Sequence, residues 1–178
     1  MQLTTSGIPH LMVTLAPEVV PAATIAALSA AGIVVSLGHS DARYDHAVQA
    51  GARCVTHLFN AMSQFAGREP GLVGAALDRT DLFCGLIADG VHVHPAALRL
   101  AWAAKRDRLF LVSDAMPTMG MAGDRFDLNG RRVTRRDGRL TLGDGTLAGA
   151  DPPLIYGVRV MVRQAGVPLD DAITLFHE

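Results

Sequence analysis

Two histidines each follow a short strand-like run of the sequence, and they lie 18 residues apart. His39 comes after residues 33–37, and His57 comes after residues 53–56. If these runs are neighbouring parallel strands, about 4.8 Å apart, two imidazoles at their ends can converge on one ion. Imidazole is the usual nitrogen ligand of zinc, and a catalytic zinc ion has three protein ligands and a water. The pair predicts a divalent metal site, and two hydrogen-bonded histidines at a sheet edge are the alternative.

A carboxylate closes a further apolar run, because Asp114 follows residues 109–113. A carboxylate at the end of a buried strand is costly unless it is paired or functional. Since a bound metal ion lowers the pKa of water, a carboxylate suffices as a general base near neutral pH. We therefore predict that Asp114 is the catalytic base. The alternative is that it caps the loop that follows.

Two further segments carry side chains suited to binding a substrate. In Asp89-Gly90-Val91-His92 the histidine is a candidate for substrate contact, whereas His94 precedes a helix that starts at Pro95. Arg68 lies in a Gly- and Pro-containing loop over residues 65–71. Its guanidinium could bind a phosphate through two parallel hydrogen bonds, or it could simply be solvated.

The elements that must position these side chains alternate between strand and helix. Strands are expected over residues 10–16, 33–37, 53–56, 82–88 and 109–112, and helices over 21–31, 41–50, 72–77 and 95–105, with Asp41 capping the second helix. Continuous apolar strands between helices predict an α/β fold with a parallel sheet. Polar residues at the ends of several strands favour a (β/α)8 barrel over an open doubly wound sheet, which binds ligands at one switch point.

The chain is shorter than a barrel requires, because a full barrel takes about 250 residues and five strands cannot close one. We therefore expect an incomplete TIM-type barrel or an open sheet. Residues 1–124 are expected to form the partial barrel, 125–146 a β-hairpin segment of a small accessory domain, and 147–178 C-terminal helices that return to the barrel. Asn-Gly at 129–130 and Asp-Gly at 137–138 and 144–145 indicate the hairpin turns, since glycine accepts a positive φ.

Two features after Asp114 are a loop rich in Met and Gly and two pairs of arginines. The Met- and Gly-rich loop over residues 116–123 is either a mobile lid or a packed segment. The pairs Arg131-Arg132 and Arg135-Arg136 are expected to form a solvated face of the hairpin.

The composition disfavours several classes of protein. The 178 residues carry 16 lysines and arginines against 17 aspartates and glutamates, a net charge of -1. Nucleic-acid binders and polybasic membrane-surface proteins need a basic face instead. No apolar run reaches the about 18 residues that span a bilayer, and residues 1–7 lack the features of a signal peptide. We expect a cytoplasmic protein in which Cys54 and Cys84 are reduced, buried thiols.

Six short motifs occur in an order and at spacings that carry a family resemblance. They are Leu-Ala-Pro-Glu at 15–18, Gly-His-Ser-Asp-Ala at 38–42, Thr-His-Leu-Phe-Asn-Ala-Met at 56–62, Gly-Arg-Glu-Pro-Gly at 67–71, Asp-Gly-Val-His at 89–92 and Ser-Asp-Ala at 113–115. Over nearly its whole length the sequence resembles the N-acetylglucosamine-6-phosphate deacetylase family of the amidohydrolase superfamily. The third and fourth motifs are specific to that family.

The resemblance implies a (β/α)8 barrel with a small accessory β-domain, a catalytic divalent metal ion, with zinc as the first expectation, and a cytoplasmic homodimer. The implied reaction removes acetate from N-acetylglucosamine 6-phosphate and gives glucosamine 6-phosphate. By motif match, His39 and His57 are the metal ligands, and Asp114 deprotonates the attacking water and then protonates the leaving amine. The implied sugar-phosphate contacts are Asn60, the backbone at Ala61, Arg68 and His92.

The sequence also departs from the family pattern. The glutamate that completes the family's metal site lies upstream of Gly-His-Ser, and no matching segment is present among residues 1–38. Glu18 belongs to a different motif and is not assigned as a ligand. Where the family has a Ser- and Thr-containing helix start, this chain has Ala150-Asp151-Pro152-Pro153. We expect the central and C-terminal part of such an enzyme. The alternatives are an amidohydrolase for another amide and a catalytically incomplete fragment.

Overall fold

The structure is a computed structural model that describes residue 8 and residues 10–177. The chain forms two compact units, Met1–Gly85 and Leu86–Glu178, which we call the first and the second unit. Residues 1–7, on which the signal-peptide prediction rests, lie outside the described residues. The expected division of this chain into 1–124, 125–146 and 147–178 stays a prediction.

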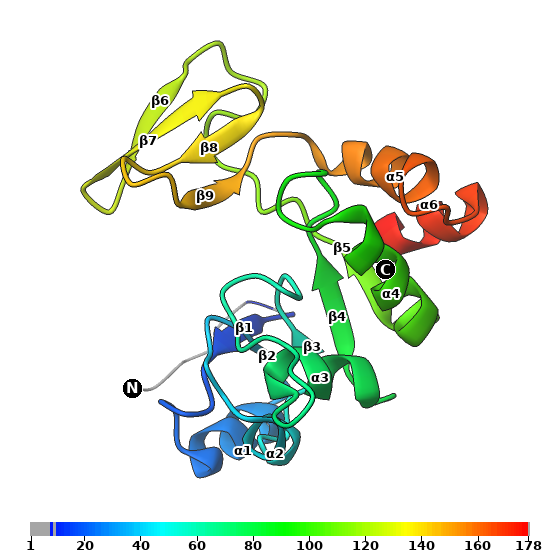
Figure 1. Ribbon diagram of the computed structural model, residues 1–178. Coiled ribbons are helices and arrows are strands. Elements are labelled where there is room, and N and C mark those ends of the chain that lie inside the picture. Colours follow the sequence, from blue (N-terminus) through cyan, green and yellow to red (C-terminus); the bar gives the residue numbers. More distant parts are fainter. Residues whose placement is uncertain (1–7, 9, 178) are drawn as a thin grey trace. The chain divides into compact units, whose positions relative to one another are not determined.

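The first unit contains parallel strands that follow one another in chain order (Figure 1). Its elements are β1 Met12–Leu15, α1 Ala22–Ala30, β2 Val34–Leu37, α2 Tyr44–Gln49, β3 Cys54–Val55, α3 Gly71–Asp78 and β4 Phe83–Leu86, whose last residue begins the second unit. Neighbouring strands from β1 to β4 are parallel. A helix lies between each pair of strands, as parallel connections require.

Apolar side chains on neighbouring strands form the core of the first unit. Leu37 on β2 pairs with Val55 on β3, and Val55 pairs with Cys84 on β4. All three residues are fully buried, and α3 buries Leu72 and Val73. Strands that are covered in this way need apolar residues at consecutive positions, which explains the continuous apolar runs of the sequence.

The second unit begins with the end of β4 and contains both helical and antiparallel parts. Its elements outside the small sheet are α4 Pro95–Lys105, the 3-10 helix η1 Arg106–Arg108, β5 Leu109–Leu111, α5 Leu154–Arg163 and α6 Leu169–His177. Directly after β5, the Val112 amide donates to the Leu86 carbonyl at 2.9 Å. The helices α5 and α6 pack together, and α6 contacts β5. The helix α4 starts at Pro95, after His94, as expected, and His94 caps it, because its Nδ1 accepts from the Ala96 amide at 3.1 Å.

An antiparallel sheet of four strands comes between β5 and α5 in the sequence of the second unit (Figure 1). Its strands are β6 Arg125–Leu128, β7 Arg131–Arg136, β8 Arg139–Thr141 and β9 Leu147–Ala150, in chain order. Both residues of the Asn129-Gly130 turn have positive φ, 50° and 77°. The Asp137-Gly138 turn is alike, with φ of 51° and 72°. Two central residues with positive φ match the twist of a hairpin, which confirms these two turn predictions.

The predicted α/β class is confirmed, since the chain contains a parallel sheet with intervening helices and a separate antiparallel sheet. This arrangement is consistent with part of a barrel and a small additional domain. Cys54 and Cys84 are free and buried, as predicted, and burial raises the pKa of the Cys54 thiol. None of the helices that the structure describes combines the length and the apolar character needed to cross a membrane.

Two predictions about single residues are wrong. Asp41 does not cap α2, which begins at Tyr44, because the Asp41 amide is held by Glu18. Arg135 is not on a solvated face, because its side chain is only 23% exposed and hydrogen-bonded within the second unit.

Candidate active site

The register of the sheet brings His39 and His57 to one place in the first unit. Ser36 pairs with Cys54 and Leu37 with Val55, so partners on β2 and β3 differ by 18 positions. His39 and His57 lie two residues beyond these strands at the same offset. Their Nε2 atoms are 3.0 Å apart, and their ring centroids are 4.8 Å apart. His57 is buried and His39 is exposed.

Left-handed backbone conformation marks both histidine segments. φ is 49° at His39 and 34° at His57, and it is 80° at Phe59 and 45° at Ala61. Residues other than glycine rarely adopt positive φ, and each instance costs of order 1–3 kcal/mol. Such strain concentrates at functional sites, because surrounding contacts must hold it in place. The apolar pattern of the sequence contains no signal for it.

Ser40 joins the two histidine segments. Its amide donates to the Ala61 carbonyl at 3.1 Å, and its own carbonyl accepts from the Ser63 amide at 3.0 Å. These bonds form an isolated parallel bridge between Ser40 and Met62. The backbone after β2 is thereby tied to the backbone after β3.

Glu18, which sequence reasoning did not assign to the site, holds this junction from the segment after β1. Its Oε2 accepts from Ser40 Oγ at 2.6 Å, and its Oε1 accepts from the Asp41 amide at 2.8 Å. Burial alone would raise the pKa of Glu18, but the hydrogen bonds from Ser40 and Asp41 outweigh it and lower the pKa below its usual value. Glu18 is therefore a carboxylate that positions the segment next to His39.

The predicted substrate contacts of the first unit differ in their exposure and in their hydrogen bonds. Asn60 Nδ2 donates to the carbonyls of His57 at 3.2 Å and Leu58 at 3.3 Å, so its amide group also supports the histidine segment. Ala61 and Arg68 are exposed. Glu69, beside Arg68, accepts from the Tyr44 amide at 2.8 Å, which gives the loop a structural anchor. Their assignment to the substrate stays a prediction.

The two histidine nitrogens have the separation expected of two ligands of one tetrahedral metal ion. Two nitrogens bound at about 2.0 Å to one tetrahedral zinc ion lie about 3.3 Å apart. The 3.0 Å between the Nε2 atoms of His39 and His57 is close to that separation. Within residues 10–177, no group of three or more His, Cys, Asp or Glu side chains is arranged to hold a metal ion. The pair therefore fits two ligand positions of a divalent ion, and the same distance fits a hydrogen bond between the two rings.

In the second unit, Asp114 also has a left-handed backbone, with φ of 48°. Its carbonyl accepts from the Ala150 amide at 2.8 Å, and the Met116 amide donates to the Ala150 carbonyl at 3.2 Å. The end of β9 therefore holds the residues on both sides of Ala115. The side chain that caps the loop is Ser113, whose Oγ accepts from the Ala115 amide at 3.3 Å. The capping alternative for Asp114 is thus not what the structure shows.

Asp89 and His92 form a buried pair after β4. The Asp89 Oδ2 and His92 Nδ1 atoms are 2.6 Å apart, and each side chain is 7% exposed. Asp89 Oδ1 accepts from the amides of Val91 and His92, each at 2.8 Å. Burial would raise the pKa of Asp89, but these hydrogen bonds outweigh it and lower the pKa. A carboxylate at Nδ1 favours a proton there, so Nε2 is the nitrogen left for a ligand.

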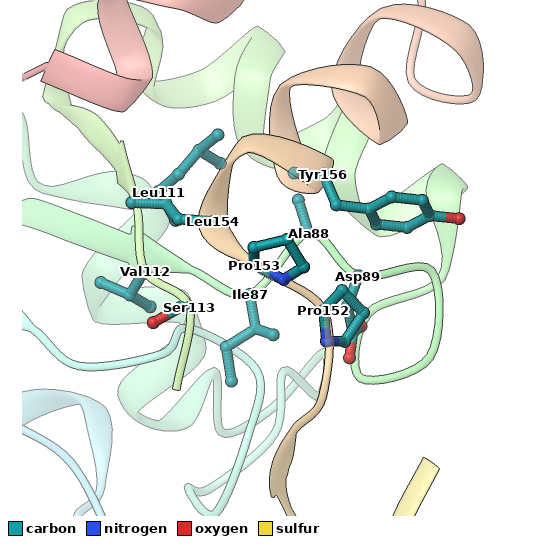
Figure 2. A pocket seen from close by; sticks show the side chains of 11 residues that line it. Ile87, Ala88, Asp89, Leu111, Val112, Ser113, Pro152, Pro153, Leu154 and Tyr156 are labelled. Carbon is teal, nitrogen blue, oxygen red and sulfur yellow. The ribbon is translucent and has the colours of Figure 1, made fainter. Parts of the chain in front are cut away.

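A small cavity lies at the ends of β4 and β5 in the second unit (Figure 2). Its lining comes from these strand ends, from Pro152 and Pro153, and from the start of α5. Its volume of about 10 Å³ leaves room for one water molecule. The cavity is therefore too small for a sugar phosphate.

Comparison with known proteins gives relatives over most of this chain. An N-acetylglucosamine-6-phosphate deacetylase of Bos taurus is 43% identical over 173 residues, covering 91% of this chain and 42% of that protein. An N-acetylgalactosamine-6-phosphate deacetylase of Shewanella sp. (strain ANA-3) is 39% identical over 168 residues, covering 92% of this chain and 43% of that protein. No protein-family model matches.

Solved structures of the same kind of enzyme share the fold. The crystal structure of N-acetylglucosamine-6-phosphate deacetylase from Pasteurella multocida gives a TM-score of 0.88 at 43% identity, over 91% of this chain and 44% of that one. A mutant of the Mycobacterium smegmatis enzyme in complex with N-acetyl-D-glucosamine-6-phosphate gives 0.86 at 37% identity, over 92% of this chain and 45% of that one. The chain thus spans less than half the length of these relatives, and the resemblance indicated by its motifs is confirmed.

Proposed function

Because this chain is homologous to part of the N-acetylglucosamine-6-phosphate deacetylases, we propose that it contributes to metal-dependent removal of acetate from N-acetylglucosamine 6-phosphate. The products are glucosamine 6-phosphate and acetate. The observation that carries the proposal is the pair His39 and His57, whose Nε2 atoms lie 3.0 Å apart at the ends of adjacent strands. The positive φ at both positions supports the proposal, because such strain clusters at active sites and ligand clamps.

His39 and His57 would hold a divalent metal ion through Nε2, with zinc as the first candidate. When bound, such an ion polarises a carbonyl oxygen and lowers the pKa of water. The structure supports ligand roles through Ser40 and Glu18, which orient the backbone beside His39. Further ligands would come from the part of the relatives' length that this chain does not span.

Asp114 is proposed to move the proton in the hydrolysis. Its carboxylate accepts a proton as the water oxygen attacks the amide carbon, and it donates that proton to the nitrogen as the carbon–nitrogen bond breaks. Acetate and the free amine of the sugar result. The Ala150 amide, bonded to the Asp114 carbonyl at 2.8 Å, keeps the backbone in the conformation from which this carboxylate projects.

The sugar phosphate is proposed to contact Asn60, the backbone at Ala61, Arg68 and His92. Arg68 is exposed and so is available to an anion, while the Asp89 carboxylate orients His92. A guanidinium and an oriented imidazole are both suited to phosphate or hydroxyl oxygens. Cytoplasmic location and a homodimer complete the proposal.

A second candidate substrate is N-acetylgalactosamine 6-phosphate. The Shewanella relative named for that substrate is 39% identical over 92% of this chain. The two sugars differ only in the configuration of one hydroxyl group, so the same metal and proton chemistry would serve both. A parallel assay on the two substrates decides between them.

The test is acetate release from N-acetylglucosamine 6-phosphate by the purified chain while zinc is titrated in. Zinc-dependent release that Asp114→Asn abolishes would show that the residues of this chain suffice. No release from a chain that binds the ion would show that it is a catalytically incomplete part of such an enzyme. Cobalt binding, followed by its visible absorption, provides a readout that needs no turnover. His39→Ala and His57→Ala should each abolish it, and His46→Ala, which alters an exposed histidine on α2, should leave it unchanged. Cobalt binding that survives loss of both site histidines would overturn the metal assignment.

A further inference from the structure

Arg135 on β7 is bonded to two separate segments of the second unit. Its Nη1 donates to the Thr118 carbonyl at 3.0 Å and to Asp151 Oδ1 at 3.1 Å. Its Nη2 donates to the Met121 carbonyl at 2.7 Å. One planar guanidinium therefore makes three hydrogen bonds, an arrangement that the fixed fork of arginine donors allows.

Both segments that Arg135 holds lead directly to Asp114. Thr118 and Met121 belong to the Met- and Gly-rich loop that follows Asp114 in the chain. Asp151 follows Ala150, whose amide donates to the Asp114 carbonyl at 2.8 Å. The guanidinium therefore connects the loop after Asp114 with the strand end that fixes its backbone.

The burial of these groups shows that the connection is specific to Arg135. The side chains of Arg135 and Asp151 are 23% and 18% exposed, whereas those of Arg132 and its partner Asp127 are 65% and 61% exposed. Arg136, the next residue on β7, is exposed. Hydrogen bonds of a partly buried charged group are stronger than those of an exposed pair. Thr118 is 4% exposed, so the loop is packed at this point.

We propose that Arg135 is a positioning residue that fixes the loop 116–121 and the end of β9 around Asp114. Asp151 is its charged partner, which gives a physical reason for the aspartate in the segment that departs from the family pattern. In the protein without substrate the loop 116–121 is held in one conformation, and the antiparallel sheet holds it through Arg135. The role of Asp114 as a catalytic base rests on the proposed function. The positioning of the loop and of the end of β9 by Arg135 does not.

The test compares Arg135→Ala with Arg136→Ala, a matched loss of an arginine from the same strand. Hydrogen exchange is measured on peptides that cover residues 114–121, and protein labelled with 13C at the methionine methyls is examined by NMR. In Arg135→Ala the loop amides should exchange about 10-fold faster or more. The Met116 methyl, which covers Gly149, should shift or broaden. Both readouts should match the wild type in Arg136→Ala.

A double variant separates the Arg135–Asp151 connection from general destabilisation. If Asp151 acts through Arg135, Arg135→Ala with Asp151→Asn should give the same loop exchange as Arg135→Ala alone. Fully additive acceleration in the double variant would overturn the pairing, and loop exchange in Arg135→Ala equal to that in Arg136→Ala would overturn the positioning role. Neither readout needs metal or substrate, so failure of the proposed deacetylase activity leaves this test intact.

Discussion

The histidine segments of the first unit and the Asp114 segment of the second unit share one backbone conformation but are held by different parts of the chain. His39, His57 and Asp114 each follow a strand and have positive φ. At His39 and His57 the holding bonds come from the neighbouring loops, through Ser40 and Glu18. At Asp114 they come from β9 and, through the adjoining loop, from Arg135 on β7.

The difference teaches that two different parts of the fold hold the candidate catalytic groups in place. The ends of adjacent parallel strands support each other, because the register of the sheet brings their loops together. The carboxylate depends instead on an inserted antiparallel sheet whose residues carry no chemistry of their own. Substitutions in that sheet should therefore affect Asp114 without touching the histidines.

The largest expected effect is that of Gly149→Ala on β9. Gly149 has φ of 79°, and a Cβ there would meet the Met116 side chain and lie 2.9 Å from the Asp114 carbonyl oxygen. Strain and displacement together should lower the free energy of unfolding by about 2–4 kcal/mol in urea titration. Gly123→Ala is the control, because that position is open and free of positive φ. Equal midpoints for both variants would contradict the tight fit of β9 against Asp114.

Two serines that precede or follow a candidate residue sharpen the comparison. Ser40 Oγ donates to Glu18 at 2.6 Å and accepts from the Ala42 amide at 3.1 Å, whereas Ser113 Oγ accepts one amide at 3.3 Å. Ser40→Ala should lower the free energy of unfolding by about 1–2 kcal/mol, and Ser113→Ala by less than about 0.5 kcal/mol. The reverse order in thermal or urea unfolding would show that the loop after β5 depends more on its own serine.

Asp89→Asn should change how stability depends on pH. Because the folded-state pKa of Asp89 lies below its unfolded value, of about 3.9, the carboxylate contributes stability that is present above that pH. This contribution is lost as pH falls through the folded-state pKa. Urea midpoints measured from pH 7 to pH 2 should therefore fall less steeply below about pH 4 in the variant. An unchanged acid limb would mean that the pair with His92 adds no net stability.

The smallest expected effect is that of Arg132→Ala. Arg132 Nε and Asp127 Oδ1 are 3.1 Å apart in a mostly exposed ion pair on the antiparallel sheet. Solvent and salt screen such pairs, so the unfolding midpoint should not change measurably. A clear loss of stability would mean that the exposed face of this sheet takes part in holding Asp114.

Much of the fold could be predicted because its signals are local. The helix Pro95–Lys105 was expected over the same residues, since Pro95 suits a first turn and the apolar residues recur at helical spacing. The Asn129-Gly130 and Asp137-Gly138 turns were also expected, because few residue types accept positive φ. By contrast β3, Cys54–Val55, is shorter than the apolar run that indicated it. Its length is set by pairing with β2 and β4.

The sequence by itself placed His39 and His57 after two consecutive strands, 18 residues apart, and the register of the sheet then brought them together. Their separation of 18 residues equals the offset between partners on β2 and β3, and any parallel register with that offset aligns them. It also determined that a carboxylate would close β5. Spacing along the chain suffices for these features, because strand and side-chain periodicity follow from the backbone itself.

Only the tertiary structure decided how the candidate residues are held. The left-handed backbone at His39, His57 and Asp114, the carboxylate of Glu18 at Ser40, and the three hydrogen bonds of Arg135 all depend on segments distant in sequence. Arg135 and Arg136 look alike as neighbours in the sequence, yet one is partly buried and bonded and the other is exposed. The burial of a side chain and its hydrogen-bond partners are properties of the folded chain, and the residue type at a position does not reveal them.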